Sequence, residues 1–173
     1  MTTTQTSPLN AVNLEAVVGL AGKIAEEPQA GATTWRADVK WTGAFRSEAS
    51  IREFAPVPSD EPAALGGDDT AANPVEQLLG ALGNCLAVGY AANASVAGIT
   101  INELDIVVEG DLDLHTFLGL ADGHAGYSDI RVIVNLESDA SPDQLADLHT
   151  KVISTSPVGH TLAAAIPVDI QLG

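Results

Sequence analysis

Residues 73–98, NPVEQLLGALGNCLAVGYAANASVAG, form the stretch that decides the fold. Asn73 is a typical N-cap, the proline after it suits the first helical position, and Glu76 stands three residues after the cap, as in a capping box. Gly98 is typical of the residue that follows a helix. The stretch therefore predicts a helix over 74–97.

Apolar residues and the only cysteine of the chain share one side of this helix. At about 100° per residue, that side collects Leu78, Leu82, Cys85, Leu86, Gly89 and Val96. Cys85 is therefore expected on the buried face. Glycine inside a helix costs about 1 kcal/mol relative to alanine, so the glycines of this helix predict that another element packs very close to it: Gly80, Gly83 and Gly89.

Two interpretations of Cys85 are open at this point. A free cysteine often acts as a small buried apolar side chain. A reactive cysteine needs a stabilised thiolate, usually beside a cation. The chain has seven basic residues, and Arg46 and Arg52 lie on a predicted strand just before the loop that leads into the cysteine helix.

The rest of the chain alternates between helical and strand patterns. Residues 1–9 are expected to be a disordered tail, Asn10 to cap a helix over 11–27 with a linker to residue 33, and residues 34–173 to form the main domain. Predicted strands cover 35–41, 46–54, 102–113, 130–136 and 166–172, with a loop over 55–73 and a helix over 142–154. This order predicts an α+β fold with antiparallel sheets.

Within these elements, periodicity marks the residues expected to be buried. Trp35, Ala37, Val39 and Trp41 alternate with polar and charged residues, which predicts a half-buried strand. The later inward-facing positions are Leu104, Ile106, Val108, Ile130, Val132, Val134 and Leu136 on strands, and Leu145, Leu148, Val152 and Ile153 on the helix.

Composition excludes several classes of function. With 23 acidic and 7 basic residues the net charge is −16, so nucleic acid and anionic membrane surfaces are excluded as partners. The N-terminus does not resemble a secretory signal, no apolar run reaches the roughly 18 residues of a membrane span, and a single cysteine suits a reducing cytoplasm.

Other chemical motifs are weak. The histidines have no spacing typical of a metal site, and GGDDT at 66–70 lacks the strand and helix of a phosphate-binding loop, so neither a metal nor a cofactor is expected. Ser156 and His160 stand four residues apart, but no GxSxG motif is present, and Pro157 and Gly159 favour a turn there.

A longer pattern resembles a known family. The run NPVEQLLGALGNCLAVGYA, followed by GITINELDIVVEGDLDL, resembles the OsmC/Ohr family of thiol-dependent peroxidases. The similarity continues through FLGL, GYSDIRVIVNLESDASPDQL and SPVGHTLAAAIPVDIQL, and covers about residues 35–172. A DEPAALGG loop before the helix is more similar to the broader OsmC-like branch than to the organic-hydroperoxide-resistance branch.

The resemblance implies an intertwined homodimer, with strongly curved antiparallel sheets, two central helices in each subunit and a thiol pocket at the dimer interface. It also implies a reaction. A cysteine thiolate attacks the O–O bond of an organic hydroperoxide, an alcohol leaves and a sulfenic acid remains. In the family a second cysteine condenses with the sulfenic acid to a disulfide, which an external dithiol reduces.

The family's site residues fall on identifiable positions. Cys85 stands at the reacting cysteine. The resemblance assigns Arg46 to the arginine that stabilises the thiolate, with Arg52 in reserve. The second cysteine is replaced by Ser156. The glutamate that holds the arginine is replaced by Val75, and Glu76 follows one residue later.

We therefore predict an OsmC-like cytoplasmic enzyme, a peroxidase with one reactive cysteine that an external thiol resets. Glu76 is expected to cap the helix or reach the arginine, and Ser156 either to hydrogen-bond near the sulfur or to be an ordinary helix-end serine. The alternatives are a non-catalytic protein that binds a small apolar ligand at the dimer interface, and a purely structural dimer.

Overall fold

Antiparallel hairpins and helices build the chain, as the α+β prediction requires. The computed structural model describes residues 8–173, so the first seven residues of the predicted tail lie outside the described part. Within that part, one unit contains the residues up to Leu14 together with Leu79–Gly173, and the other contains Glu15–Leu78.

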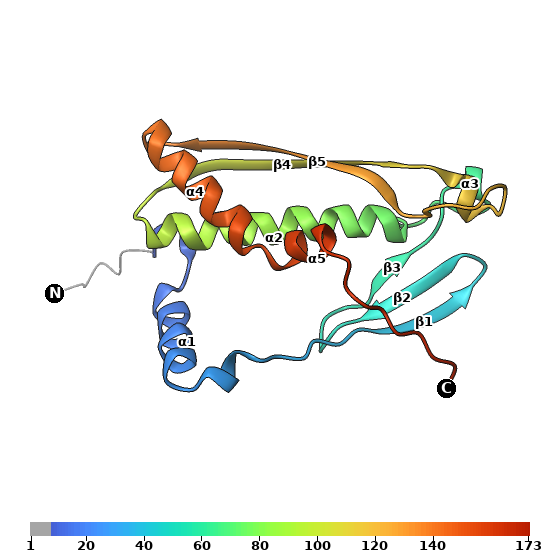
Figure 1. Cartoon of the computed structure of the whole chain (residues 1–173), viewed down its shortest axis with the longest axis horizontal. Helices are drawn as coiled ribbons and strands as arrows, with labels where there is room; N and C mark the ends of the chain where they lie inside the picture. The colour runs from blue at the N-terminus through green and yellow to red at the C-terminus, as the bar shows by residue number, and fades with distance from the viewer. Residues whose placement is uncertain (1–7) are drawn as a thin grey trace. The chain divides into compact units, whose positions relative to one another are not determined.

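The first unit is a long hairpin packed on the cysteine helix. The helix, α2, spans Pro74–Val96, and its first turns belong to the other unit. Strand β4 (Ile101–Leu112) pairs with β5 (Tyr127–Ser138) in antiparallel register, and the hairpin runs along α2 (Figure 1). The remaining helices of this unit are α3 (Leu114–Phe117), α4 (Pro142–Thr155) and α5 (Pro157–Ala163).

The core of this unit lies between α2, α4 and the inner face of the hairpin. Its buried residues are Leu82, Leu86, Tyr90 and Ala94 of α2, Ile99 after it, and Leu148 and Val152 of α4. Partly buried Leu104, Ile106, Val108, Ile130, Val134 and Leu136 pack against them, as predicted.

A few predicted core residues are instead exposed. Ile153 is 53% exposed because it lies about 100° around α4 from buried Val152. Val132 is also exposed, and so are Leu78 and Val96 near the ends of α2.

Close packing on α2 is confirmed at Gly89. A Cβ atom there would lie 3.0 Å from Cγ1 of Val152, so α4 approaches the helix backbone directly. At Gly83 a Cβ would make an ordinary contact, 3.4 Å from Val108. At Gly80 it would meet no atom of the described residues within 4 Å, so the single chain explains only part of the glycine pattern.

The second unit contains a small antiparallel sheet. Helix α1 spans Leu14–Glu26 and is followed by a 3-10 turn, η2, at Pro28–Gly31. The sheet has the order β1-β2-β3, with strands Asp38–Gly43, Arg46–Ser50 and Val57–Ser59. Strand β3 and a 3-10 turn, η3, at Ala63–Leu65 lie inside the segment predicted as a loop, so that prediction was wrong in its first part.

The half-buried face predicted for the first strand is not buried. Trp35 is 80% exposed, Trp41 71%, and Val39 is exposed as well. An alternating pattern is typical of a strand whose apolar face is covered by another layer. Among the described residues of the single chain, no layer covers this face.

Two predictions at the ends of the chain are also corrected. Asn10 does not cap a helix. It lies in a 3-10 turn, η1, at Leu9–Ala11. Its side-chain Nδ2 donates to Oγ of Ser95 and to the carbonyl of Ile99, and its Oδ1 accepts from the backbone amide of Ile101. The predicted last strand is absent among the described residues: 166–172 pairs with no strand of the chain, and Ile170 is 89% exposed.

Candidate active site around Cys85

Cys85 and Ser156 meet although they stand far apart in the sequence. Cys85 lies in the middle of α2 and is half-buried, and its Sγ is 3.4 Å from Oγ of Ser156. Ser156 is buried at the junction between α4 and α5. The predicted contact of this serine with the sulfur is therefore present.

The junction engages the Ser156 hydroxyl in a second hydrogen bond. Ser156 is the N-cap of α5, and its Oγ accepts from the backbone amide of Gly159 at 3.1 Å. The hydroxyl keeps its hydrogen and a second lone pair, so either Oγ or Sγ can be the donor in the contact between them. The turn predicted from Pro157 and Gly159 is instead the start of helix α5.

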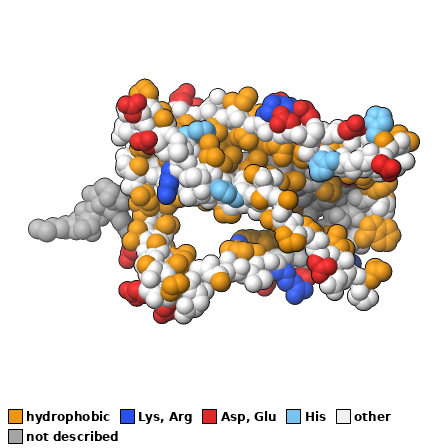
Figure 2. All heavy atoms as spheres, viewed as in Figure 1, with side chains coloured by type: hydrophobic (Ala, Val, Ile, Leu, Met, Phe, Trp, Pro, Cys, Tyr) orange, Lys and Arg blue, Asp and Glu red, His pale blue; other side chains and the backbone are white. Residues whose placement is uncertain are grey.

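An apolar groove reaches Ser156, whereas Cys85 is not part of its lining. It has a volume of about 720 Å³, in the range of small-molecule sites. Ser156 belongs to its lining, and Figure 2 shows hydrophobic side chains exposed between the β4–β5 hairpin and helices α4 and α5, with histidines beside them. The apolar lining comprises Leu82, Leu86, Ile130, Val132, Val134, Ile153, Leu162 and Ala163.

Tyr90 and His149 form a polar pair on the same groove. Tyr90 is 2% exposed, its hydroxyl bonds to Nδ1 of His149, and the two rings stack with centroids 6.1 Å apart. Burial raises the pKa of the Tyr90 hydroxyl above its ordinary value. This pair was not predictable from local sequence patterns, because the two residues stand on different helices.

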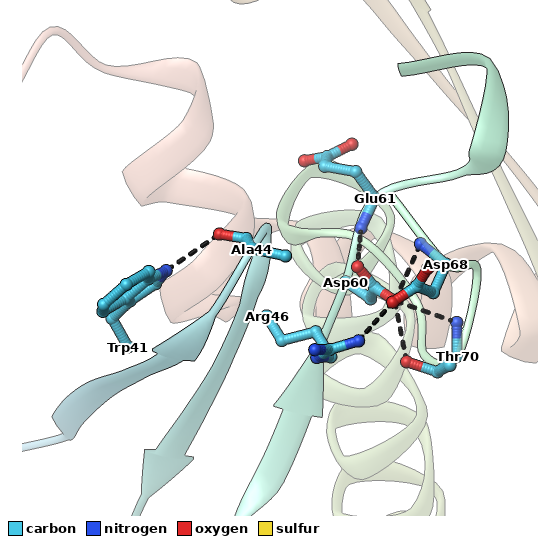
Figure 3. A network of polar contacts seen from close by, with 7 residues as sticks. All are labelled: Trp41, Ala44, Arg46, Asp60, Glu61, Asp68 and Thr70. Carbon is cyan, nitrogen blue, oxygen red and sulfur yellow. Dashed lines mark hydrogen bonds and ion pairs between the residues drawn. The ribbon is translucent and has the colours of Figure 1, made fainter. Parts of the chain in front are cut away.

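Arg46, the predicted thiolate-stabilising residue, begins strand β2 directly after the turn that follows β1. Its guanidinium forms an ion pair with Asp68 (Figure 3). The reserve candidate, Arg52, lies over the ring of Phe54, with its guanidinium carbon 4.5 Å from the centroid. Both arginines belong to the Glu15–Leu78 unit.

Glu76 acts as the helix cap that the sequence predicted. Its carboxylate accepts from the backbone amide of Asn73 at 2.9 Å, and its own amide donates to Oδ1 of Asn73 at 2.9 Å. This reciprocal capping box satisfies two backbone amides at the start of α2 and occupies the Glu76 carboxylate.

Asp60 is a buried carboxylate that sequence reasoning missed. It accepts from the hydroxyl of Thr70 at 2.7 Å and from the amides of Glu61, Asp68 and Thr70 (Figure 3). The Thr70 hydroxyl, with help from these amides, lowers the pKa of Asp60 below its ordinary value. The one available signal was an aspartate at the entrance of a Pro- and Gly-rich loop, which is a common position for side chains that bind turn amides.

Two features are absent from residues 8–173: a metal-binding cluster and a membrane-spanning helix. No group of three or more His, Cys, Asp or Glu residues there is arranged to hold a metal ion. None of the helices in this range combines the length and the apolar character that crossing a membrane requires.

One protein family is identified by comparison with known proteins. The model of the family described as OsmC-like protein matches residues 66–171. No curated protein has a sequence that matches this chain closely.

Solved structures share its fold. An OsmC-like protein from Mycoplasma pneumoniae is 20% identical, with 76% of this chain and 88% of that chain covered and a TM-score of 0.66. An organic hydroperoxide resistance protein OsmC from Legionella pneumophila is 16% identical, with 76% and 91% covered and a TM-score of 0.56. One from Elizabethkingia anophelis is 16% identical, with 75% and 89% covered and a TM-score of 0.55.

Proposed function

The chain belongs to the OsmC-like protein family, and on that premise we propose that it reduces organic hydroperoxides with Cys85 as its single reactive cysteine. Two of the structures that share its fold are named organic hydroperoxide resistance proteins. The observation that carries the proposal is the half-buried thiol with the Ser156 hydroxyl 3.4 Å from its sulfur.

The proposed reaction converts one hydroperoxide and two thiols into an alcohol, water and a disulfide. The Cys85 thiolate attacks one oxygen of the hydroperoxide, the O–O bond breaks, and the other oxygen leaves as an alkoxide that takes a proton to become an alcohol. The sulfur is oxidised to a sulfenic acid. One external thiol then forms a mixed disulfide with Cys85 and releases water, and a second thiol regenerates the Cys85 thiol as the external disulfide leaves.

An external reductant is needed because Cys85 is the only cysteine of the chain. The position of the family's second cysteine holds Ser156, whose hydroxyl cannot form a disulfide. In the proposed cycle this hydroxyl instead donates to the thiolate. The thiol requirement suits a reducing compartment, and we place the enzyme in the cytoplasm.

Arg46 is proposed to stabilise the Cys85 thiolate and the oxygen that leaves, with Arg52 as the second candidate. A guanidinium stays charged at any physiological pH and offers five N–H donors. The ion pair with Asp68 engages Nη1 of Arg46 and leaves donors for the substrate.

The groove is proposed to hold the organic part of the hydroperoxide. Its mainly apolar lining favours an alkyl or aryl group over hydrogen peroxide, because burial of apolar surface supplies binding energy that a small polar peroxide lacks.

A homodimer is proposed from the apolar surface that the single chain leaves uncovered. The alternating segment 166–172 has the pattern of a strand but pairs with none of the described strands, and Trp35 and Trp41 are exposed. A second copy that paired with this segment and covered these rings would satisfy both patterns. Sedimentation of the full chain should then give a dimer, and deletion of residues 166–173 should give a monomer.

The direct test mixes the purified protein with cumene hydroperoxide and a dithiol, and measures loss of the hydroperoxide. We expect consumption that the Cys85→Ser variant lacks, and faster turnover with cumene hydroperoxide than with hydrogen peroxide. Equal rates for the wild type and Cys85→Ser would reject the peroxidase function.

A second function is favoured by the groove and by the missing second thiol: binding of a small apolar ligand without chemistry. Iodoacetamide alkylation of Cys85 as a function of pH separates the two. A midpoint below about pH 7 indicates an activated thiolate. A midpoint at or above about 8.5, the value of an ordinary thiol, together with saturable binding of an apolar fluorophore, would favour the binding protein.

A further inference from the structure

Arg46 lies beside a loop that is unusually well fixed for a Pro- and Gly-rich segment. The loop spans residues 60–70 and contacts two successive residues: Phe45, in the β1–β2 turn, and Arg46, which begins β2. At the first, a Cβ on Gly66 would lie 3.3 Å from Cε2 of Phe45, so the loop backbone rests against that ring. At the second, the carboxylate of Asp68 pairs with the guanidinium of Arg46.

The buried carboxylate of Asp60 binds polar groups of this loop. It is 1% exposed, and its Oδ2 accepts from the amide of Asp68 at 3.3 Å and from the amide and hydroxyl of Thr70 at 3.2 and 2.7 Å (Figure 3). The backbone of the residue that binds Arg46 is thus itself tied to a buried carboxylate.

Glu61 and Gly67 of this loop also lie so close together that position 67 has no room for a side chain. A Cβ on Gly67 would lie 1.8 Å from the carbonyl oxygen of Glu61, which no side chain could tolerate. The amide of Asp69 donates to the same carbonyl at 3.1 Å. The loop therefore has one tight closure, and Asp68 stands at a defined place on it.

The loop is joined to the start of the cysteine helix. The side-chain amide of Asn73 donates to the carboxylate of Glu61 at 3.3 Å, and the same residue forms the capping box of α2 with Glu76. Glu76 is therefore engaged at the helix end, and the residue before it is Val75, which has no carboxylate.

We propose that Asp68 is the positioning residue for Arg46, a role that rests on the proposed peroxidase function. An exposed ion pair between two mobile side chains contributes little to stability. Here one partner is fixed by its backbone, so the pair restricts the guanidinium to one direction. Asp68 thereby supplies, from the loop, the carboxylate that position 75 lacks.

The test compares Asp68→Asn with Asp69→Asn. Both remove one negative charge from adjacent positions of the same loop, and asparagine tolerates the left-handed backbone of Asp69, where φ is 55°. For Asp68→Asn we expect kcat with cumene hydroperoxide to fall about tenfold, as for a misplaced catalytic group, with KM within about twofold. Asp68→Glu should recover part of the loss, and Asp69→Asn should keep both constants within about twofold of the wild type.

A second measurement follows Arg46 without any chemistry. The chain has four arginines, so the Nε–H signal of Arg46 can be assigned by its loss in Arg46→Lys. We expect its heteronuclear NOE to show an ordered side chain in the wild type and in Asp69→Asn, and a mobile one in Asp68→Asn.

The two readouts separate the two proposals. If the wild type consumes no hydroperoxide but Asp68→Asn still releases Arg46, the peroxidase function fails and the positioning of Arg46 by Asp68 stands. If Arg46 keeps its order in Asp68→Asn, or if Asp68→Asn and Asp69→Asn have equal kcat in an active enzyme, the role of Asp68 is refuted.

Discussion

The substitution Gly89→Ala tests how closely helices α2 and α4 pack against each other. An alanine Cβ there would lie 3.0 Å from Cγ1 of Val152, whereas non-bonded carbons prefer about 3.5–4.0 Å. Val152 is 1% exposed, and a β-branched side chain in a helix has one strongly preferred χ1, so it has little freedom to turn aside. Overpacking costs about 1–3 kcal/mol, and the better helix propensity of alanine offsets about 1 kcal/mol. Gly89→Ala is therefore expected to lower the free energy of unfolding by about 1 kcal/mol.

The assay is urea unfolding followed by far-ultraviolet circular dichroism, at one fixed protein concentration because self-association shifts the apparent stability. In a Val152→Ala background the clash is absent, and the same Gly89→Ala change should stabilise the protein by up to about 1 kcal/mol. The reasoning is refuted if Gly89→Ala has the same effect in both backgrounds, since the two residues would then not be coupled.

Three further predictions address the site and its supports. Ser156→Cys places a second sulfur close to Cys85, because Oγ of Ser156 lies 3.4 Å from Sγ of Cys85. One equivalent of hydroperoxide should then convert both thiols into a disulfide. A thiol titration that still finds one free thiol would contradict this. Asp60→Asn should lower the Tm at neutral pH. The folded-state pKa of Asp60 is lowered, so its stabilising effect is complete above the ordinary value of about 3.9 and is lost as pH falls through the folded-state pKa. A Tm difference between the wild type and Asp60→Asn that persists in stronger acid would contradict this. Asn10→Ala leaves the amide of Ile101 without its acceptor and should cost about 1–3 kcal/mol; a loss below about 0.5 kcal/mol in urea unfolding, the range of an ordinary surface change, would show that this contact is unimportant.

Helix ends and strand pairing were predictable because their signals are local. The cap at Asn73 and Glu76 and the glycine at position 98 bracket α2 in the sequence as they do in the structure. The alternation over β4 and β5 likewise predicted the side chains that face the core, except for Val132, which is exposed. Burial of Trp35 and a last strand over 166–172 were not confirmed, because each needs a covering surface or a partner strand that the described single chain does not provide.

By itself the sequence determined the helix that carries Cys85, the antiparallel α+β class and the family pattern. Its one cysteine also excludes an internal disulfide cycle. The tertiary structure decided which side chains meet: Ser156 at the sulfur of Cys85, Tyr90 at His149, and Asp68 at Arg46. These contacts join residues 71, 59 and 22 positions apart. Local periodicity specifies which face of each helix or strand is apolar. Which of these faces pack against each other depends on the tertiary fold of the whole chain.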